Sequence, residues 1–248
     1  MFMQKISRRG KHEIFHISTS IQRHIINKSN FTYRIILRVL NKFLKNQKKV
    51  LDIGCGVGTL SFYLAKKGNY VLGIDISKNA VNVCKKSAKI FGLRDIKFQR
   101  MDFPNEIPRD KFDLIVCSEV LEHLEDDDLA LKKIYSLLRP NGIVIISVPS
   151  KNAPLYRLGL AKKFDKRVGH LRRYTLSELV NKCQKAKFTI LETRKTEGAL
   201  RNFLFLNPVA GKFVRFIKFF LSDIISLLDW ISLRFFGESQ VFVVVGRL

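Results

Sequence analysis

Short apolar runs alternate with helical patterns through the central part of the chain. Residues 59–67, 77–92 and 127–142 have helical patterns, with Ser77 as an N-cap and Gly142 near a helix end. The apolar runs are short and rich in β-branched residues, which predicts strands. They are VLDIG (50–54), YVLGID (70–75), IKFQ (96–99), FDLIVC (112–117) and GIVIISV (142–148). Strands that alternate with helices predict right-handed crossovers and a mostly parallel, doubly wound α/β sheet.

The C-terminal third adds one helix and two strands to this pattern. Residues 175–186 predict a helix in which Thr175 and Glu178 form a capping box. The last two strands are predicted at 188–196 and 240–248.

The segments that flank the core have patterns of their own. Residues 1–49 look mainly helical, and 149–174 form a connection rich in proline and basic residues. We therefore expect a basic N-terminal extension, a core domain in two parts, and one hydrophobic insertion. Their bounds are 1–47 for the extension, 48–198 with 238–248 for the core domain, and 199–237 for the insertion.

The insertion is about 40 residues long, whereas hairpin connections usually have about two to five. Its pattern is helical from about 212 to 235, with a narrow polar stripe on a mostly apolar surface. The stripe consists of Lys212, Arg215, Lys218, Ser222, Ser226 and Asp229, and the apolar majority includes Phe213, Phe216, Phe220, Ile224, Leu227, Leu228 and Trp230. Charges interrupt the segment too often for a membrane span of about 18 residues or more.

We interpret this segment as an amphipathic helix that lies in a membrane interface, with its basic end near the headgroups and Trp230 as an interfacial aromatic. A helix packed on the protein's own core, a homodimer interface, and a tunnel for a prenyl or acyl tail are the alternatives. The interfacial helix and the tunnel both imply a lipid-like acceptor.

The charge of the chain is strongly positive and uneven. Lys and Arg number 45 against 21 Asp and Glu, a formal net charge of +24. Residues 1–49 carry +11 and residues 151–218 carry +13, while 50–150 are nearly neutral. Basic flanks predict contact with an anionic partner, which we take to be a membrane surface rather than nucleic acid. A Lys-rich but functionally neutral surface is the alternative.

The four cysteines are scattered and form no C-x-x-C pair, which disfavours a disulfide scaffold and a zinc ribbon and indicates a reducing compartment. The N-terminal segment lacks an uninterrupted apolar stretch, so we expect no secretory signal. These observations predict a cytoplasmic protein, peripheral on the cytoplasmic face of the membrane.

A glycine-rich turn follows the first predicted strand. Asp52 precedes Gly54, Gly56 and Gly58, and a helix begins directly afterwards. Glycines at such a turn let the backbone approach a ligand, and the helix N-terminus adds amide donors. The third glycine of a dinucleotide fingerprint would fall at Thr59, which disfavours a nicotinamide-dependent oxidoreductase. An acid beside the turn suits a ligand with an ammonium group.

Two further acids end the next strands. Asp75 ends the second strand, where a carboxylate can accept hydrogen bonds from ribose hydroxyls. Asp102 follows the third strand and would accept from an adenine amine, with Phe103 beside the ring. An ammonium site, a ribose acceptor and an adenine acceptor in this order describe S-adenosylmethionine.

At these residues the sequence resembles the class I S-adenosylmethionine-dependent methyltransferases, over about 48–198 and the final strand. The resemblance implies a Rossmann-like, seven-stranded sheet of order 3-2-1-4-5-7-6 with strand 7 antiparallel, and here a hydrophobic helical insertion before the last strand. It also implies the cofactor-binding residues. They are Asp52, Gly54, Cys55, Gly56 and Gly58 around the methionine end, Asp75 and Ile76 at the ribose, Asp102 and Phe103 at the adenine, and Ser118 after the fourth strand.

The fourth strand leads into a motif of possible ligands and bases. Glu119, Glu122 and His123 lie within five residues, and if a helix starts there Glu119 shares a face with the other two. His170 lies on the connection after strand five, which should cover the same edge. Two carboxylates with imidazoles suit a divalent cation such as Mg²⁺, Mn²⁺ or Zn²⁺.

This E-x-x-E-H motif with a distant histidine resembles the ubiquinone-biosynthesis O-methyltransferases and the small-RNA 3′-terminal 2′-O-methyltransferases. The resemblance implies a metal site of Glu119, Glu122, His123 and His170 that holds vicinal oxygens of the acceptor. The alternative is a site without metal, in which the glutamates line the methionine pocket and His123 is a general base or a structural residue. Arg172, Arg173 and Tyr174 are expected on the acceptor side. Asp126, Asp127 and Asp128 are expected to form a solvated helix start.

Together these features predict an S-adenosylmethionine-dependent methyltransferase that methylates an oxygen of a lipid-linked or prenylated acceptor at the membrane. An RNA methyltransferase that uses the basic flanks, and a non-catalytic S-adenosylmethionine-binding subunit at the membrane, are the alternatives.

Overall fold

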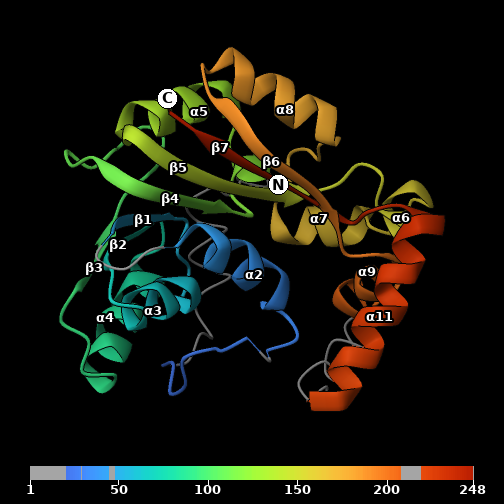
Figure 1. Cartoon of the computed structure of the whole chain (residues 1–248), viewed down its shortest axis with the longest axis horizontal. Helices are drawn as coiled ribbons and strands as arrows, with labels where there is room; N and C mark the ends of the chain where they lie inside the picture. Colours follow the sequence, from blue (N-terminus) through green and yellow to red (C-terminus); the bar gives the residue numbers. More distant parts are fainter. Residues whose placement is uncertain (1–20, 29, 45–47, 208–218, 248) are drawn as a thin grey trace, which may run out of the picture.

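The computed structural model describes residues 21–28, 30–44, 48–207 and 219–247, and a single seven-stranded sheet organises them (Figure 1). The strands are β1 (Lys49–Ile53), β2 (Tyr70–Asp75), β3 (Ile96–Arg100), β4 (Phe112–Ser118), β5 (Leu138–Pro149), β6 (Thr189–Thr196) and β7 (Gln240–Gly246). Their order is β3-β2-β1-β4-β5-β7-β6. Strands β1 to β5 pair in parallel, and β7 is antiparallel to both β5 and β6. The predicted sheet, including its strand order, is therefore confirmed.

Helices cover both faces of the sheet, as a doubly wound fold requires (Figure 1). One face packs against α2 (Arg34–Phe43), α3 (Thr59–Lys66) and α4 (Lys78–Ile90). The other packs against α5 (Asp127–Leu137) and α8 (Leu176–Lys185). The central strands are buried on both faces, which explains why their sequences are continuously apolar rather than alternating.

Local capping signals gave correct helix starts. The Ser77 hydroxyl accepts from the Ala80 amide, 3.1 Å away, at the start of α4. Thr175 and Glu178 form the predicted capping box at the start of α8. These side chains satisfy amides that the first helical turn leaves without an intrahelical partner.

The helix predicted at 127–142 is shorter in the structure than in the prediction. Helix α5 stops at Leu137, and β5 begins at the next residue. Pro140 explains the early stop, because a proline disfavours the helical conformation of the residue before it and has no amide to donate. Asn141 then has a positive φ of 58°.

In its described part, the N-terminal extension is less helical than predicted. In the described part of residues 21–49, α2 is the only helix, and 1–20 lie outside the described residues. The connection after β5 contains two short helices, α6 (Pro154–Arg157) and α7 (Lys162–Val168).

The insertion between β6 and β7 forms two helices, α9 (Ala199–Leu206) and α11 (Phe219–Phe236), which pack together at one end of the sheet (Figure 1). Helix α11 confirms the predicted helix over 219–235, whereas α9 was not predicted. Lys212, Phe213, Arg215, Phe216 and Lys218 lie outside the described residues. No helix within the described ranges has both the length and the apolar character that crossing a bilayer demands.

Candidate active site

The glycine turn after β1 lies at the carboxyl edge of the sheet, where ligands of open α/β folds bind. Gly54, Gly56 and Gly58 all have positive φ angles, of 66°, 52° and 83°. A Cβ on Gly54 would lie 2.5 Å from Cγ2 of Val120, and one on Gly58 would lie 2.8 Å from the ring of Phe62. The turn thus requires glycine for its own packing and conformation as well as for the approach of a ligand.

Two of the predicted acids lie beside this turn. Asp75 accepts hydrogen bonds from the amides of Gly56 and Ser77, both at 2.8 Å, and so holds the turn against the end of β2. Asp52 is 3% exposed and accepts a hydrogen bond from the Ser61 hydroxyl. Burial raises the pKa of Asp52 from 3.8 to about 7, partly offset by the hydrogen bond from Ser61.

The remaining predicted cofactor residues line up along the same edge, because β3, β2, β1 and β4 are neighbours in the sheet. Cys55 and Ile76 follow β1 and β2. Asp102 follows β3, and its carboxylate accepts from the Asn105 amide at 3.3 Å. The side chain of Phe103 is buried in the core. Ser118 ends β4, with its hydroxyl 2.7 Å from that of Ser147.

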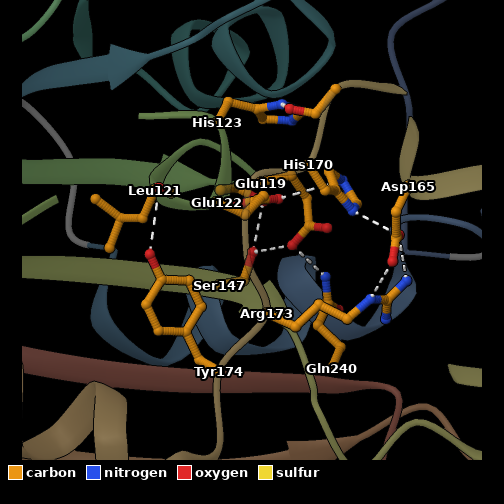
Figure 2. A network of polar contacts seen from close by, with 12 residues as sticks. Glu119, Leu121, Glu122, His123, Ser147, Asp165, His170, Arg173, Tyr174 and Gln240 are labelled. Atoms are coloured by element: carbon orange, nitrogen blue, oxygen red, sulfur yellow. Dashed lines mark hydrogen bonds and ion pairs between the residues drawn. The ribbon is translucent and has the colours of Figure 1, made fainter. Parts of the chain in front are cut away.

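Glu119 has an unusual backbone conformation directly after β4. Its φ is +55°, and the chain then makes a single 3-10 turn, η1 (Leu121–His123). The α-helical start that would place Glu119 on one face with Glu122 and His123 is therefore absent at this point of the described chain. The Glu119 carboxylate instead accepts from Gln240 at 2.7 Å and from Ser147 at 3.3 Å (Figure 2). A residue other than glycine in this conformation is characteristic of functional sites.

Glu122, His123 and His170 come together across the edge (Figure 2). One potential ligand atom from each lies within 4.8 Å of the others. Nε2 of His170 is 3.9 Å from Oε1 of Glu122, and the two imidazole rings are in edge contact with centroids 4.9 Å apart. The predicted set of four is thus reduced to three, since Glu119 does not belong to this group.

Glu122 is fully buried, and neither of its carboxylate oxygens has a hydrogen-bond partner among the described residues. Burial, reinforced by the nearby Glu119, raises the pKa of Glu122 well above its usual range. A buried carboxyl group without a partner takes up a proton or a cation. One carboxylate and two imidazoles form a ligand set that divalent transition metals accept, so the residues present fit a metal ion.

Asp165 and Arg173 hold His170 in position. Nδ1 of His170 lies 2.9 Å from Asp165, and the Arg173 guanidinium donates to both oxygens of that carboxylate, at 2.9 and 2.6 Å. This contact fixes the proton of His170 on Nδ1 and leaves Nε2 for Glu122 or a ligand. Asp165 was not among the predicted site residues, although it is the only acid in the basic segment 151–173.

The structure changes the roles predicted for three neighbouring residues, Tyr174, Arg172 and Asp127. Tyr174 is buried and donates to Asp127 at 2.8 Å, so it does not face an acceptor. Arg172 pairs with the same carboxylate at 2.8 Å, and Lys182 does so at 3.0 Å. The expected solvated helix start is wrong for Asp127, which is 3% exposed, while Asp126 caps α5 through the Leu129 amide. Only Arg173 keeps contact with the site.

A cavity of about 330 Å³ adjoins the cluster. Ser118, Glu119 and His170 form its wall at the sheet edge. The opposite walls come from α2, α7 and α9, through residues that include Ile35, Ile36, Phe164, Phe205 and Leu206. The cavity therefore has room for a small, partly apolar molecule beside the end of β4.

The fold is an α/β fold with a glycine turn and acids along one sheet edge, a form suited to a nucleoside cofactor, and with a cavity beside the end of β4. A family model described as a methyltransferase domain matches residues 44–201. A ubiquinone biosynthesis O-methyltransferase of Pasteurella multocida is 31% identical over 184 residues, 67% of this chain and 72% of that protein. The chain belongs to the methyltransferase domain family, and it is an S-adenosylmethionine-dependent methyltransferase.

The curated relatives are matched over only part of their length. The matched parts span from 46% to 72% of the ubiquinone biosynthesis O-methyltransferases of Aeromonas salmonicida, Paracidovorax citrulli and Pasteurella multocida. The shared name therefore describes those proteins, and their acceptor does not transfer automatically to this chain.

Solved structures share the fold. Magnesium protoporphyrin IX methyltransferase from Synechocystis PCC 6803, with bound S-adenosylhomocysteine, has a TM-score of 0.59 at 20% identity, over 88% of this chain and 82% of that one. The cyclase SpnF has a TM-score of 0.69 at 16% identity, over 97% of each chain. At these identities the likeness shows the fold alone, and the fold does not select the acceptor.

The raised pKa of Asp52 predicts a pH-dependent affinity for the cofactor. If Asp52 binds the ammonium group at the methionine end, it must be ionised in the complex, so below pH 7 binding requires loss of a proton. The Kd for S-adenosylhomocysteine is then expected to fall by up to about tenfold per unit as pH rises toward 7, and to level off above it. Calorimetry between pH 5.5 and 8.5 measures this, and Asp52→Asn should bind weakly and without the slope. An unchanged slope in that variant would remove Asp52 from the binding site.

The raised pKa of Asp52 has the opposite effect on stability: a rise in pH favours cofactor binding but lowers the stability of the ligand-free protein. The folded pKa of about 7 lies above the ordinary value of 3.8, so between these values the folded state holds the extra proton. The contribution of Asp52 to the free energy of unfolding therefore declines as pH rises from about 4 to 7.

Proposed function

We propose that the protein transfers the methyl group of S-adenosylmethionine to a hydroxyl oxygen of a small acceptor with a lipid-like tail. The observation that carries this proposal is the cluster of Glu122, His123 and His170, which reaches the cavity wall through His170. The name shared by the curated relatives supports O-methylation and a prenylated acceptor. The apolar walls of the cavity support an acceptor that is only partly polar.

The chain's residues supply positioning and proton transfer. Asp52, Asp75 and the glycine turn hold the cofactor, and the cavity aligns the acceptor oxygen with the methyl carbon. The oxygen–carbon bond forms as the carbon–sulfur bond breaks, and the sulfur keeps the electron pair, which yields S-adenosylhomocysteine. His123 accepts the hydroxyl proton. The sulfonium is already activated, so no covalent enzyme intermediate is required.

Glu122, His123 and His170 are also the residues that would hold a divalent cation. A cation bound there would lower the pKa of a coordinated hydroxyl. In that case His123 acts as a ligand rather than as the base, and removal of metal distinguishes the two roles.

We also propose that the protein works at the cytoplasmic face of a membrane. Its net charge of +24 favours an anionic leaflet. Its four cysteines are free and buried, which agrees with a reducing compartment. A lipid-like acceptor would be concentrated at that surface.

Methyl transfer to a prenylated catechol tests the proposed reaction, because this probe offers two vicinal hydroxyls on an apolar tail. We expect isotopically labelled methyl to appear on one oxygen, as measured by mass spectrometry. Absence of transfer to this probe and to total lipid extract would contradict the proposal.

Removal of metal tests the role of the cluster. If a divalent cation is required, exhaustive dialysis against EDTA is expected to abolish transfer, and Mg²⁺, Mn²⁺ or Zn²⁺ should restore it. Binding of S-adenosylhomocysteine should be unaffected, because the proposed ligands are not in the glycine turn. Full activity after EDTA treatment would assign His123 to the role of base.

A further inference from the structure

Polar side chains along helix α11 form hydrogen bonds with the rest of the protein, although that of Asp223 stays 68% exposed. Asp223, Ser226, Asp229 and Ser232 recur every three residues along it. Arg34 of α2 donates to Asp223 at 2.6 Å and to Ser226 at 3.0 Å. The amides at the start of α9 donate to Asp229 and Ser232. The stripe that would face water on an ordinary surface helix is therefore used for internal contacts.

The other side of α11 is apolar and exposed. We call it the outer face of α11. Its residues, with their exposed fractions, are Ile224 (38%), Leu227 (58%), Leu228 (52%), Trp230 (53%), Ile231 (42%), Phe235 (77%) and Phe236 (57%). A contiguous apolar surface of this kind marks a site of interaction, because its removal from water is favourable.

The connection between α6 and α7 also exposes apolar side chains, and the chain just before α6 lies beside the end of α11. Gly237, directly after α11, approaches Asn152 so closely that a Cβ would lie 2.9 Å from the Asn152 carbonyl oxygen. In the segment that follows, Leu158 and Leu160 are 71% and 66% exposed. α6, α9 and the end of α11 lie together at the right of Figure 1.

This connection is also strongly basic. Residues 151–173 contain eight Lys and Arg against one acid, Asp165, which is already engaged by His170 and Arg173. Five of the basic residues are exposed, namely Arg157, Lys162, Lys163, Lys166 and Arg167. Exposed leucines interleaved with exposed cations match a surface that is apolar inside and anionic at its headgroups.

We propose that the outer face of α11, together with the α6–α7 connection, docks on an anionic phospholipid bilayer. The helix lies in the interface plane with its apolar side toward the acyl chains, and its polar side remains bound to α2 and α9. Arg234 lies 4.8 Å from the ring centroid of Trp230, a pair suited to the headgroup level. The charge of the connection favours lipid over a second copy of this equally basic chain.

Docking in this orientation brings the cavity close to the lipid. Helix α9 lies against α11, with Arg201 donating to Ser226 at 3.3 Å, and its Phe205 and Leu206 line the cavity. One helix thus separates the bilayer surface from the acceptor site. This inference rests on the proposed function for its lipid-like acceptor, and it adds the surface by which the enzyme reaches that acceptor.

Sedimentation of the full chain with vesicles tests the surface. We expect binding to vesicles of equal parts phosphatidylcholine and phosphatidylglycerol, and much weaker binding to phosphatidylcholine alone. The double variant Leu227→Glu/Phe235→Glu should reduce the bound fraction at least tenfold, and Lys162→Glu/Lys163→Glu should reduce binding mainly at low salt. Ile90→Glu is the matched control, because Ile90 is also 58% exposed but lies at the end of α4.

Calorimetry with S-adenosylhomocysteine verifies that each variant is folded. Wild-type protein that ignores anionic vesicles, or a double variant that binds them like wild type, would overturn the proposal. Equal binding to neutral and anionic vesicles would also overturn it. So would sedimentation velocity that shows a dimer for wild type and a monomer for the double variant, because the outer face of α11 would then be a dimer interface. Transfer to a short-chain prenylated catechol in free solution is measured in parallel. If wild-type protein does not methylate this probe, the proposed function is refuted. If it methylates the probe but does not bind vesicles, only the docking surface is refuted.

Discussion

Replacing His123 by alanine is expected to lower kcat for methyl transfer by about 10²–10⁴-fold, the usual contribution of a positioned general base. The Gly169 carbonyl oxygen lies 3.2 Å from Nδ1 of His123, which orients the ring beside His170 and Glu122. The Kd for S-adenosylhomocysteine should change little, because its proposed contacts lie at the ends of β1, β2, β3 and β4 and do not include His123. Single-turnover transfer to a prenylated catechol and calorimetry measure the two quantities.

Two further variants make this prediction specific. Glu122→Gln preserves the shape of a side chain whose oxygens have no hydrogen-bond partner in the described chain, so the fold should persist while the rate falls by a comparable factor. His24→Ala removes an exposed histidine outside the site and should leave kcat unchanged. Wild-type rates for both His123→Ala and Glu122→Gln would mean that the cluster is not the reaction centre.

Replacing Asp229 by alanine is expected to lower the free energy of unfolding by about 3–5 kcal/mol, as found when one partner of a buried ion pair is removed. Asp229 is 4% exposed and accepts from the amides of Gly198 and Arg201, at 3.0 and 2.8 Å. Its carboxylate is also 3.5 Å from Nε of Arg201, which is 1% exposed. The variant removes one of the two acids, Asp229 and Glu197, that act on a buried guanidinium, and it leaves two buried amides without an acceptor.

Urea denaturation followed by circular dichroism measures this loss. Asp110→Ala is the matched control, because both side chains of its ion pair with Lys49 are solvent-accessible, at 60% and 36%, and such a pair should contribute only about 0–1 kcal/mol. Similar small losses in both variants would contradict the close packing of α11 on α9.

The core sheet was predictable because its signals are local. The run VLDIG followed by a glycine turn specifies β1, the turn and the start of α3 within about ten residues. Apolar continuity then marks each central strand, since the helices on both faces bury it. The strand order came from the family resemblance instead, because periodicity alone does not say which strands are neighbours.

Helix α9 escaped prediction because its capping group is remote in sequence. The first amides of α9 donate to Asp229, about 30 positions further along the chain, and no polar residue at Gly198 signals a helix start. Which side of α11 faces the protein was not predictable for a related reason. Its spacing predicts a polar and an apolar side, but the partners that attract the polar side, Arg34 and Arg201, come from other elements.

The site shows the same limit. Asp75 beside the glycine turn, and Glu122 near His123, were predictable from strand ends and spacing. The contacts of Glu119 with Gln240, and of His170 with Asp165 and Arg173, were not, because they depend on how loops after β5 and β6 fold over the sheet edge. The positive φ of Glu119 also has no sequence signal, since glycine or asparagine is the residue usually associated with it.

The entry and exit of the insertion meet in one rung of the sheet, where Thr196 of β6 pairs with Gln240 of β7. The insertion therefore begins and ends at two residues that are paired with each other, and the pairing of β6 with β7 continues from there toward Thr189 and Gly246. A change in the length of the insertion therefore leaves the pairing of β6 with β7 possible, but it alters the cavity wall, because Phe205 and Leu206 of α9 line it. A chimera that carries a short turn in place of the insertion should keep the strand pairing of the parent.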